Sequence, residues 1–82
     1  MVTNDTSVRM IKVNAKMFEA VGYCEASRHL YVKYRNGQVR CFENVPHFRI
    51  QGLLNSPRKD GYFKSYLQNS FLSKEAKLPG QP

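Results

Sequence analysis

The sequence predicts an α+β fold in which a three-stranded antiparallel β-meander packs against two C-terminal helices. The dipeptide Asn36-Gly37 lies between two segments of alternating polarity, which is the strongest short-range signal of a β-hairpin. The segments 46–55 and 61–71 instead repeat their apolar residues at helical spacing. A length of 82 residues fits one domain with a modest core.

The strands of the meander are expected at residues 17–24, 29–35 and 38–44. Gly22 lies inside the first of these and permits a bulge or a bend. Residues 1–12 precede the meander as a lead-in that is either flexible or forms a short edge strand. Consecutive antiparallel strands usually lie next to each other in space, so the strand order follows the chain.

A two-residue type I′ turn at Asn36-Gly37 would fix the pairing of the second and third strands. It places Lys33 opposite Arg40. Because side chains alternate between faces, one face is expected to be buried: Leu30, Val32, Tyr34, Val39 and Cys41. The other face is expected to be exposed, basic and aromatic: Tyr31, Lys33, Arg35, Gln38, Arg40 and Phe42.

Two helices are expected to cover the apolar face of this sheet. Pro46 suits the first turn of a helix over 46–55, and Pro57 ends it, because the residue before a proline is pushed out of the α region. Asp60 is the expected N-cap of the second helix, over 61–71. The stripe of that helix that should face the sheet comprises Phe63, Tyr66, Leu67, Ser70 and Phe71.

The chain is strongly basic, with a formal net charge of +7. Eight cations and two acids lie between Arg28 and Lys64, so the charge belongs to the folded part. Such a field favours polyanions, with nucleic acid first and an anionic membrane second. No apolar run suggests a signal peptide or a bilayer span, so we expect a cytoplasmic location and no membrane partner.

The sequence offers little for redox or metal chemistry. Cys24 and Cys41 are expected to be inert, reduced thiols on different strands. Together with His29 and His47 they show no metal-ligand spacing, so neither a metal nor a cofactor is expected.

An ordered set of short motifs supports a family resemblance. The motifs are Val21-Gly22-Tyr23, Leu30-x-Val32-x-Tyr34, Gly37, Val45-Pro46, Leu53-Leu54-Asn55 and Tyr62-Phe63. Together they resemble the KTSC domain, a small module found at the C-terminus of some lysyl-tRNA synthetases and alone in short bacterial and phage proteins. The resemblance implies an RNA-binding role. It places the domain at residues 13–72, followed by a disordered tail over 73–82.

Three positions depart from the family pattern. The family's central Tyr-x-Tyr falls on Arg40-Cys41-Phe42, and its Ser-x-Gly before the second helix falls on Arg58-Lys59-Asp60. An early family serine falls on Ala15. If these positions need a hydroxyl, the chain has lost that role; if they bind anions, it has gained charge.

Nucleic-acid binding, to RNA or another single strand, is the function that these features favour. Cations would contact phosphates while unstacked bases lie on the aromatic rings. The expected binding residues are Tyr31, Lys33, Arg35, Arg40, Phe42, Arg58 and Lys59.

Two other interpretations of this face remain open, and a third, an enzyme, is not favoured. The same aromatic patch rimmed by arginine would suit a protein-interaction module, for example a phage or mobile-element regulator of a host complex. The charged face could also be an ordinary solvated surface. An enzyme is not expected, because His47 has no Ser, Cys or acid near it in the sequence to act with it.

Overall fold

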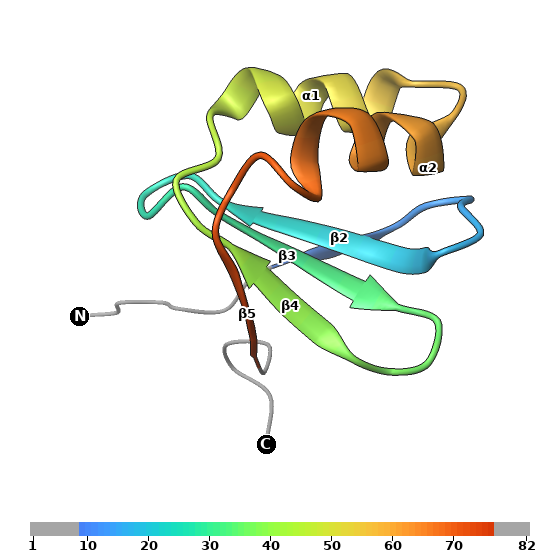
Figure 1. The fold of residues 1–82 in the computed structure, drawn as a ribbon, viewed down its shortest axis with the longest axis horizontal. Coiled ribbons are helices and arrows are strands. Elements are labelled where there is room, and N and C mark those ends of the chain that lie inside the picture. Colours follow the sequence, from blue (N-terminus) through green and yellow to red (C-terminus); the bar gives the residue numbers. More distant parts are fainter. Residues whose placement is uncertain (1–8, 77–82) are drawn as a thin grey trace.

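The protein, described by a computed structural model over residues 9–76, is a five-stranded antiparallel sheet with helices on one face (Figure 1). The strands follow in chain order as β1 (Met10–Lys12), β2 (Phe18–Cys24), β3 (His29–Tyr34), β4 (Val39–Phe42) and β5 (Ser73–Glu75). The helical layer comprises α1 (His47–Asn55), α2 (Lys59–Tyr62) and the π-helical turn η1 (Phe63–Leu67). The α+β class is confirmed, but the sheet has five strands instead of three.

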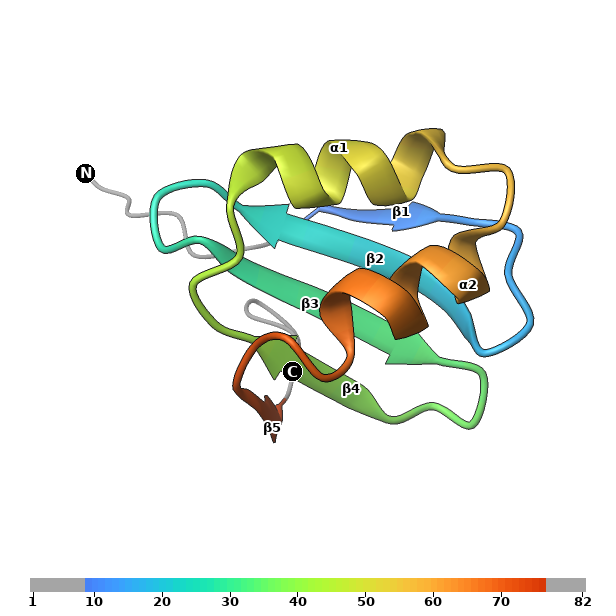
Figure 2. The ribbon, with the colours of Figure 1, turned by 45° about the horizontal axis from the view of Figure 1, so that its top comes forward.

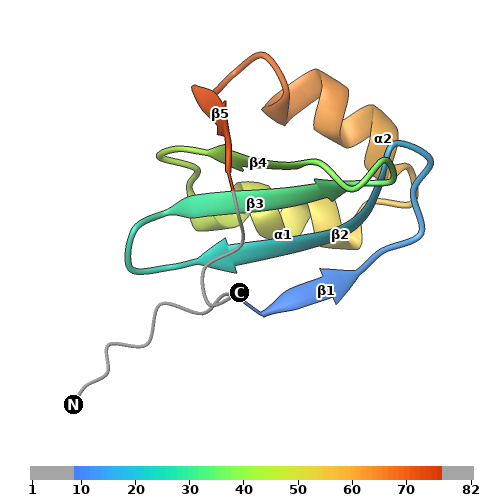
Figure 3. The same cartoon turned by 90° about the horizontal axis from the view of Figure 1, so that it is seen from below.

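The two additional strands lie at opposite edges of the sheet (Figure 3). β1 pairs with β2 and realises the edge strand allowed for the lead-in. β5 pairs with β4, although residues 73–75 were expected in a disordered tail. The polar sequence of β5 hides this role, which is to satisfy the N–H and C=O groups along the edge of β4. Residues 1–8 of the lead-in and 77–82 of the tail lie outside the described residues.

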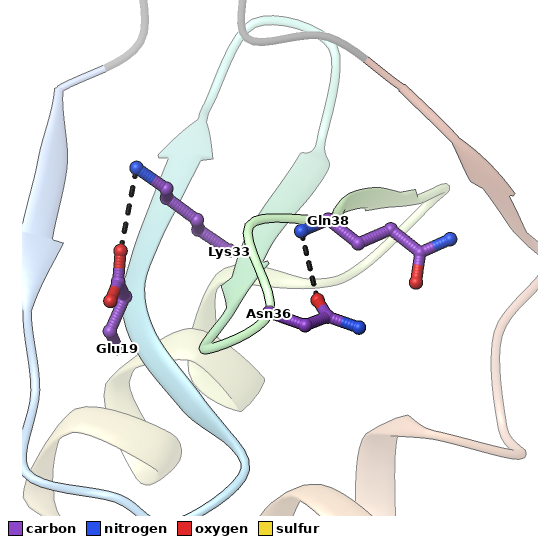
Figure 4. A network of polar contacts seen from close by, with 4 residues as sticks. All are labelled: Glu19, Lys33, Asn36 and Gln38. Atoms are coloured by element: carbon purple, nitrogen blue, oxygen red, sulfur yellow. Dashed lines mark hydrogen bonds and ion pairs between the residues drawn. The ribbon is translucent and has the colours of Figure 1, made fainter.

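The turn between β3 and β4 contains three loop residues instead of two. The Tyr34 N–H donates to the Gln38 carbonyl at 2.8 Å, and the Gly37 N–H donates to the Tyr34 carbonyl at 3.0 Å. Gly37 has a φ of +92°, whereas Asn36 is not among the residues with positive φ. The Asn36 Oδ1 instead accepts the Gln38 N–H at 2.9 Å (Figure 4). This is a type I turn followed by a left-handed glycine, the other common hairpin form.

The longer turn shifts the register of β4 by one residue, so the predicted pairing is wrong. Lys33 lies opposite Val39, and Arg40 lies opposite Val32. A slip of one residue moves every side chain of a strand to the other face. Phe42 therefore points into the core, and Cys41 shares a face with Tyr31.

The core fills the space between the sheet and the helical layer (Figure 2). Its centre is Phe63, which is fully buried. The Phe63 ring centroid lies 5.2 Å from that of Phe18 and 5.4 Å from that of Phe42. Leu67 is also fully buried, as the helical stripe predicted.

Two other residues of the predicted stripe, Tyr66 and Ser70, are turned away from the sheet, whereas Phe71 is partly buried against the core. Tyr66 is 45% exposed, and Ser70 is exposed beyond the end of the helix. The cause is the π-turn, in which the Gln68 N–H donates to the Phe63 carbonyl five residues earlier. A wider turn keeps residues four apart on one face and rotates residues three apart away from each other.

Asp60 does not cap the second helix, which begins one residue earlier at Lys59. Its carboxylate instead accepts the backbone N–H of Lys16 at 2.7 Å and that of Met17 at 2.8 Å. These two donors belong to the connection between β1 and β2. Asp60 therefore fastens the helical layer to the start of the sheet.

Gly52 lets α1 and α2 approach each other closely, because the Tyr62 side chain occupies the space that a Cβ would need. We expect Gly52→Ala to lower the free energy of unfolding by about 1 kcal/mol, since the displacement of Tyr62 outweighs the gain in helix propensity. The matched control is Gly61→Ala, where the nearest atom is the Arg58 Cβ at 3.8 Å. That variant should be stabilised by up to about 1 kcal/mol. Thermal unfolding measures both variants. The reasoning is contradicted if the two substitutions change the stability in the same direction.

Candidate nucleic-acid interface

The structure does not gather the predicted basic and aromatic residues on one face of the sheet. Tyr31 and Lys33 lie on the helix-free face, which is the face of the sheet opposite the helices (Figure 3). Arg40 and Phe42 lie on the helix side because of the register shift. Phe42 is 1% exposed and Tyr31 is 9% exposed, so neither ring is accessible for stacking with a base.

Four of the five predicted cations are held by neighbouring groups, one of them Arg35, whose Nε and Nη2 donate to the Ala15 carbonyl. The Lys33 Nζ lies 3.4 Å from the Glu19 Oε2 (Figure 4), with about 40% of each side chain exposed. The Arg40 Nε and Nη2 donate to the Ser73 Oγ at 3.3 and 3.1 Å. The Lys59 Nζ donates to a backbone carbonyl at 3.0 Å. Arg40 is thus committed to joining β4 to β5, whereas Lys33 stays half-exposed.

The helix-free face carries a shallow hollow of about 550 Å³ over β1, β2 and β3. A bulge in β2 between Phe18 and Ala20 turns Glu19 to this face, next to Lys33. We call this feature the sheet hollow. It is lined by Met10, Lys12, Val13, Glu19, Ala20, Lys33 and Arg35.

A second hollow of about 740 Å³ lies where the β1–β2 connection meets the start of α2. We call it the end hollow. It is lined by Asn14, Ala15, Lys16, Arg35, Pro57, Arg58, Lys59, Asp60 and Gly61. Arg35 borders both hollows, and its Nε and Nη2 donate to the Ala15 carbonyl at 2.9 and 2.7 Å. This anchored arginine links the two hollows into one band.

The band is strongly basic. Its cations are Lys12, Lys16, Lys33, Arg35, Arg58 and Lys59. Its acids are Glu19, which pairs with Lys33, and Asp60, whose two oxygens accept backbone N–H groups. Burial raises the pKa of Asp60, but the Lys16 and Met17 hydrogen bonds and nearby lysines outweigh it and leave the pKa below its ordinary value. Both acids stay ionised, so the six cations and two acids leave the band with a net charge of 6 − 2 = +4.

The sequence had identified four of these six cations and missed Lys12 and Lys16. Lys12 ends β1 and Lys16 lies in the connection between β1 and β2, so both are outside the stretch whose charge stood out. No motif or charge cluster in this short segment of the sequence indicates them. Only the folding of this segment against Arg35 and α2 brings them to the same surface.

The remaining chemistry of the described residues is sparse. Hydrogen bonds from Ser27 lower the pKa of the Cys24 thiol, whereas burial raises the pKa of the Cys41 thiol. Both thiols are free, and β3 separates their strands as expected. Within residues 9–76, no three His, Cys, Asp or Glu side chains lie together as metal ligands. No helix in the same range is both long and apolar enough to cross a bilayer.

Comparisons with known proteins agree with the geometry. The KTSC domain family model matches residues 14–71. The crystal structure of a KTSC domain protein from Yersinia pestis is similar, with a TM-score of 0.82 and 18% sequence identity. That match covers 87% of this chain and 100% of the Yersinia chain. At this identity the similarity shows a shared fold. No curated protein matches the chain.

Proposed function

The chain belongs to the KTSC domain family, and we propose that it is a small binding module that holds RNA or another single strand by its phosphates. The observation that supports this proposal is the band formed by the sheet hollow and the end hollow, which has six cations including the shared Arg35. Phosphate contacts from lysine and arginine supply most of the sequence-independent affinity of nucleic-acid-binding proteins. We therefore assign the binding of the single-stranded nucleic acid to this band.

The proposed contact is led by phosphates and not by bases. Tyr31 and Phe42, which the sequence offered as stacking platforms, are both buried. No aromatic ring lines either hollow. Affinity should therefore depend little on base sequence and strongly on salt.

The band has a fixed part and an adaptable part. The guanidinium of Arg35 is held by the Ala15 carbonyl, so its remaining N–H groups are positioned in advance. Lys12, Lys16 and Arg58 are exposed and can follow the path of a flexible strand. A pre-positioned donor loses less freedom on binding than a mobile one, so Arg35 should set the position of the backbone.

The test is a titration of a labelled single-stranded RNA at several salt concentrations, followed by fluorescence anisotropy. Six phosphate contacts on a single strand would give a slope of log K against log salt of about −4. We expect Lys12→Ala and Arg58→Ala, one from each hollow, each to weaken binding several-fold and to reduce the slope by roughly 0.7. Neither side chain has a recorded partner among residues 9–76, so stability should change little.

Lys74→Ala is the charge-matched control. Lys74 lies on β5, at the sheet edge farthest from β1, and its Nζ is 3.5 Å from the Glu43 Oε2. The substitution Lys74→Ala removes one cation and changes no residue that lines either hollow. The proposal fails if the parent protein does not bind at low salt, or if Lys74→Ala weakens binding as much as the two band variants. The same titration with single-stranded DNA and with duplex RNA would show which type of nucleic acid the protein prefers.

A further inference from the structure

The outer surface of the helical layer carries an aromatic cluster that the basic band does not include. It consists of Phe48 and Arg49 on α1, Tyr62 at the end of α2 and Tyr66 in η1. Phe48 is 60% exposed and Tyr66 is 45% exposed, and exposed apolar side chains that lie together mark an interaction site more often than isolated ones do. The Tyr62 and Tyr66 ring centroids lie 4.8 Å apart, which makes the surface continuous between α2 and η1.

Arg49 joins this surface across the two helical segments. Its Cζ lies 5.0 Å from the Phe48 ring centroid and 4.7 Å from the Tyr66 ring centroid. A guanidinium held between two rings keeps its edge N–H groups free to donate. None of the ion pairs or side-chain hydrogen bonds recorded within residues 9–76 involves Arg49. The side chain is thus ordered by its neighbours and still lacks a carboxylate partner in the described part of the chain.

The composition of the cluster favours a protein over a nucleic acid. Arginine, tyrosine and other aromatic residues are enriched at the energetic centres of protein interfaces. A polyanion gains its affinity from several cations, whereas the cluster provides three rings and a single cation. The surface also lies across the sheet from the sheet hollow, because the helices and that hollow occupy opposite faces.

A second copy of this chain is a poor occupant. A partner for Arg49 must offer an uncommitted carboxylate, yet every Asp and Glu within residues 9–76 already has a partner. These carboxylates are Glu19 with Lys33, Glu25 with His47, Glu43 with Lys74, Asp60 with two backbone N–H groups, and Glu75 with Gln38. Two copies of a chain with a formal net charge of +7 also repel each other, so an acidic segment of a different protein is the better fit to Arg49.

We propose that the aromatic cluster is a docking surface for an acidic segment of a different protein. The segment would place an Asp or Glu carboxylate on the guanidinium edge of Arg49. A neighbouring bulky apolar side chain of the same segment would pack on Phe48 and Tyr66. This inference does not rest on nucleic-acid binding, because no residue of the cluster lines either hollow of the band.

The test is a selection from a displayed library of random peptides of about 12 residues against the parent protein, with enriched peptides then synthesised and titrated. We expect the enriched peptides to carry an acid next to an aromatic or a leucine. Their affinity should fall at least roughly tenfold in Arg49→Ala, Phe48→Ala and Tyr66→Ala. Arg49→Lys should restore only part of it, because an ammonium does not stack as a planar guanidinium does.

Controls separate this result from unfolding and from the basic band. All cluster variants alter exposed or half-exposed side chains, and thermal unfolding should show melting temperatures near that of the parent. Arg58→Ala should leave peptide affinity unchanged while weakening RNA binding. The proposal is overturned if no peptide is enriched, if enriched peptides lack acids, or if they bind Arg49→Ala as well as the parent. It is also overturned if Arg49→Ala and Tyr66→Ala weaken RNA binding but not peptide binding.

Discussion

Phe63→Ala is expected to lower the free energy of unfolding by about 3–5 kcal/mol. The Phe63 ring is fully buried and contacts rings from the sheet, with centroid distances of 5.2 Å to Phe18, 5.4 Å to Phe42 and 6.3 Å to Tyr34. Its removal leaves a cavity between the sheet and η1 that neighbouring rings cannot fill. Since small domains are stable by about 5–15 kcal/mol, this loss is a large share of the total. Urea unfolding followed by circular dichroism measures it.

Phe48→Ala is the matched control, because it deletes the same atoms from a ring that is 60% exposed. Its stability should stay within about 0.5 kcal/mol of the parent. Should Phe63→Ala fail to fold, Phe63→Leu provides a milder step with an expected loss of roughly 1.5 kcal/mol. Equal effects at the two positions would mean that η1 does not pack on the sheet as described.

The position of Phe63 could be predicted from the sequence, and so could most of the architecture. Apolar spacing separated the helical half of the chain from the strands, and alternation around Gly37 located the central hairpin. Burial of large apolar side chains dominates the energy of such elements, so their pattern is visible in a single chain. β5 escaped prediction because it is held by backbone hydrogen bonds to an edge strand, and these require no particular side chains.

The register of the hairpin could not be predicted from the sequence. The composition of each face of the sheet depends on that register and could not be predicted either. Asn36-Gly37 is compatible with a two-residue turn and with the three-residue turn that forms. The choice depends on whether Asn36 adopts a left-handed conformation or uses its Oδ1 to accept the Gln38 N–H. Both turns are common in β-hairpins, so packing decides between them. Burial of Phe42 against Phe63 favours the observed register.

The candidate site was partly visible in the sequence. Four cations were identified from local charge: Lys33, Arg35, Arg58 and Lys59. Lys12 and Lys16 join them only in the folded chain. Charge density along a sequence reports the sign of a surface, but not which segments meet there.

The role of Asp60 was hidden for a related reason, since its partners are backbone N–H groups 43 and 44 residues away. Asp60→Ala removes the acceptor for both groups, and a hydrogen bond to a charged group contributes about 1.5–3 kcal/mol. We expect the free energy of unfolding at neutral pH to fall by roughly 2–3 kcal/mol. Asp60→Asn should lose less, because its carbonyl oxygen still accepts one of the two N–H groups.

The pH dependence of stability distinguishes the charge of Asp60 from its shape. Its pKa in the folded protein lies below the ordinary value of 3.8. The stabilisation by the carboxylate is therefore present above that ordinary value and is lost as the pH falls through the lower, folded-state pKa. Urea unfolding at about pH 7 and about pH 3 should show a smaller difference for Asp60→Asn than for the parent. Glu75→Gln, a change at an exposed carboxylate whose partner is the neutral Gln38, should retain the pH dependence of the parent. If Asp60→Asn retains it as well, the carboxylate does not fasten α2 to the sheet through its charge.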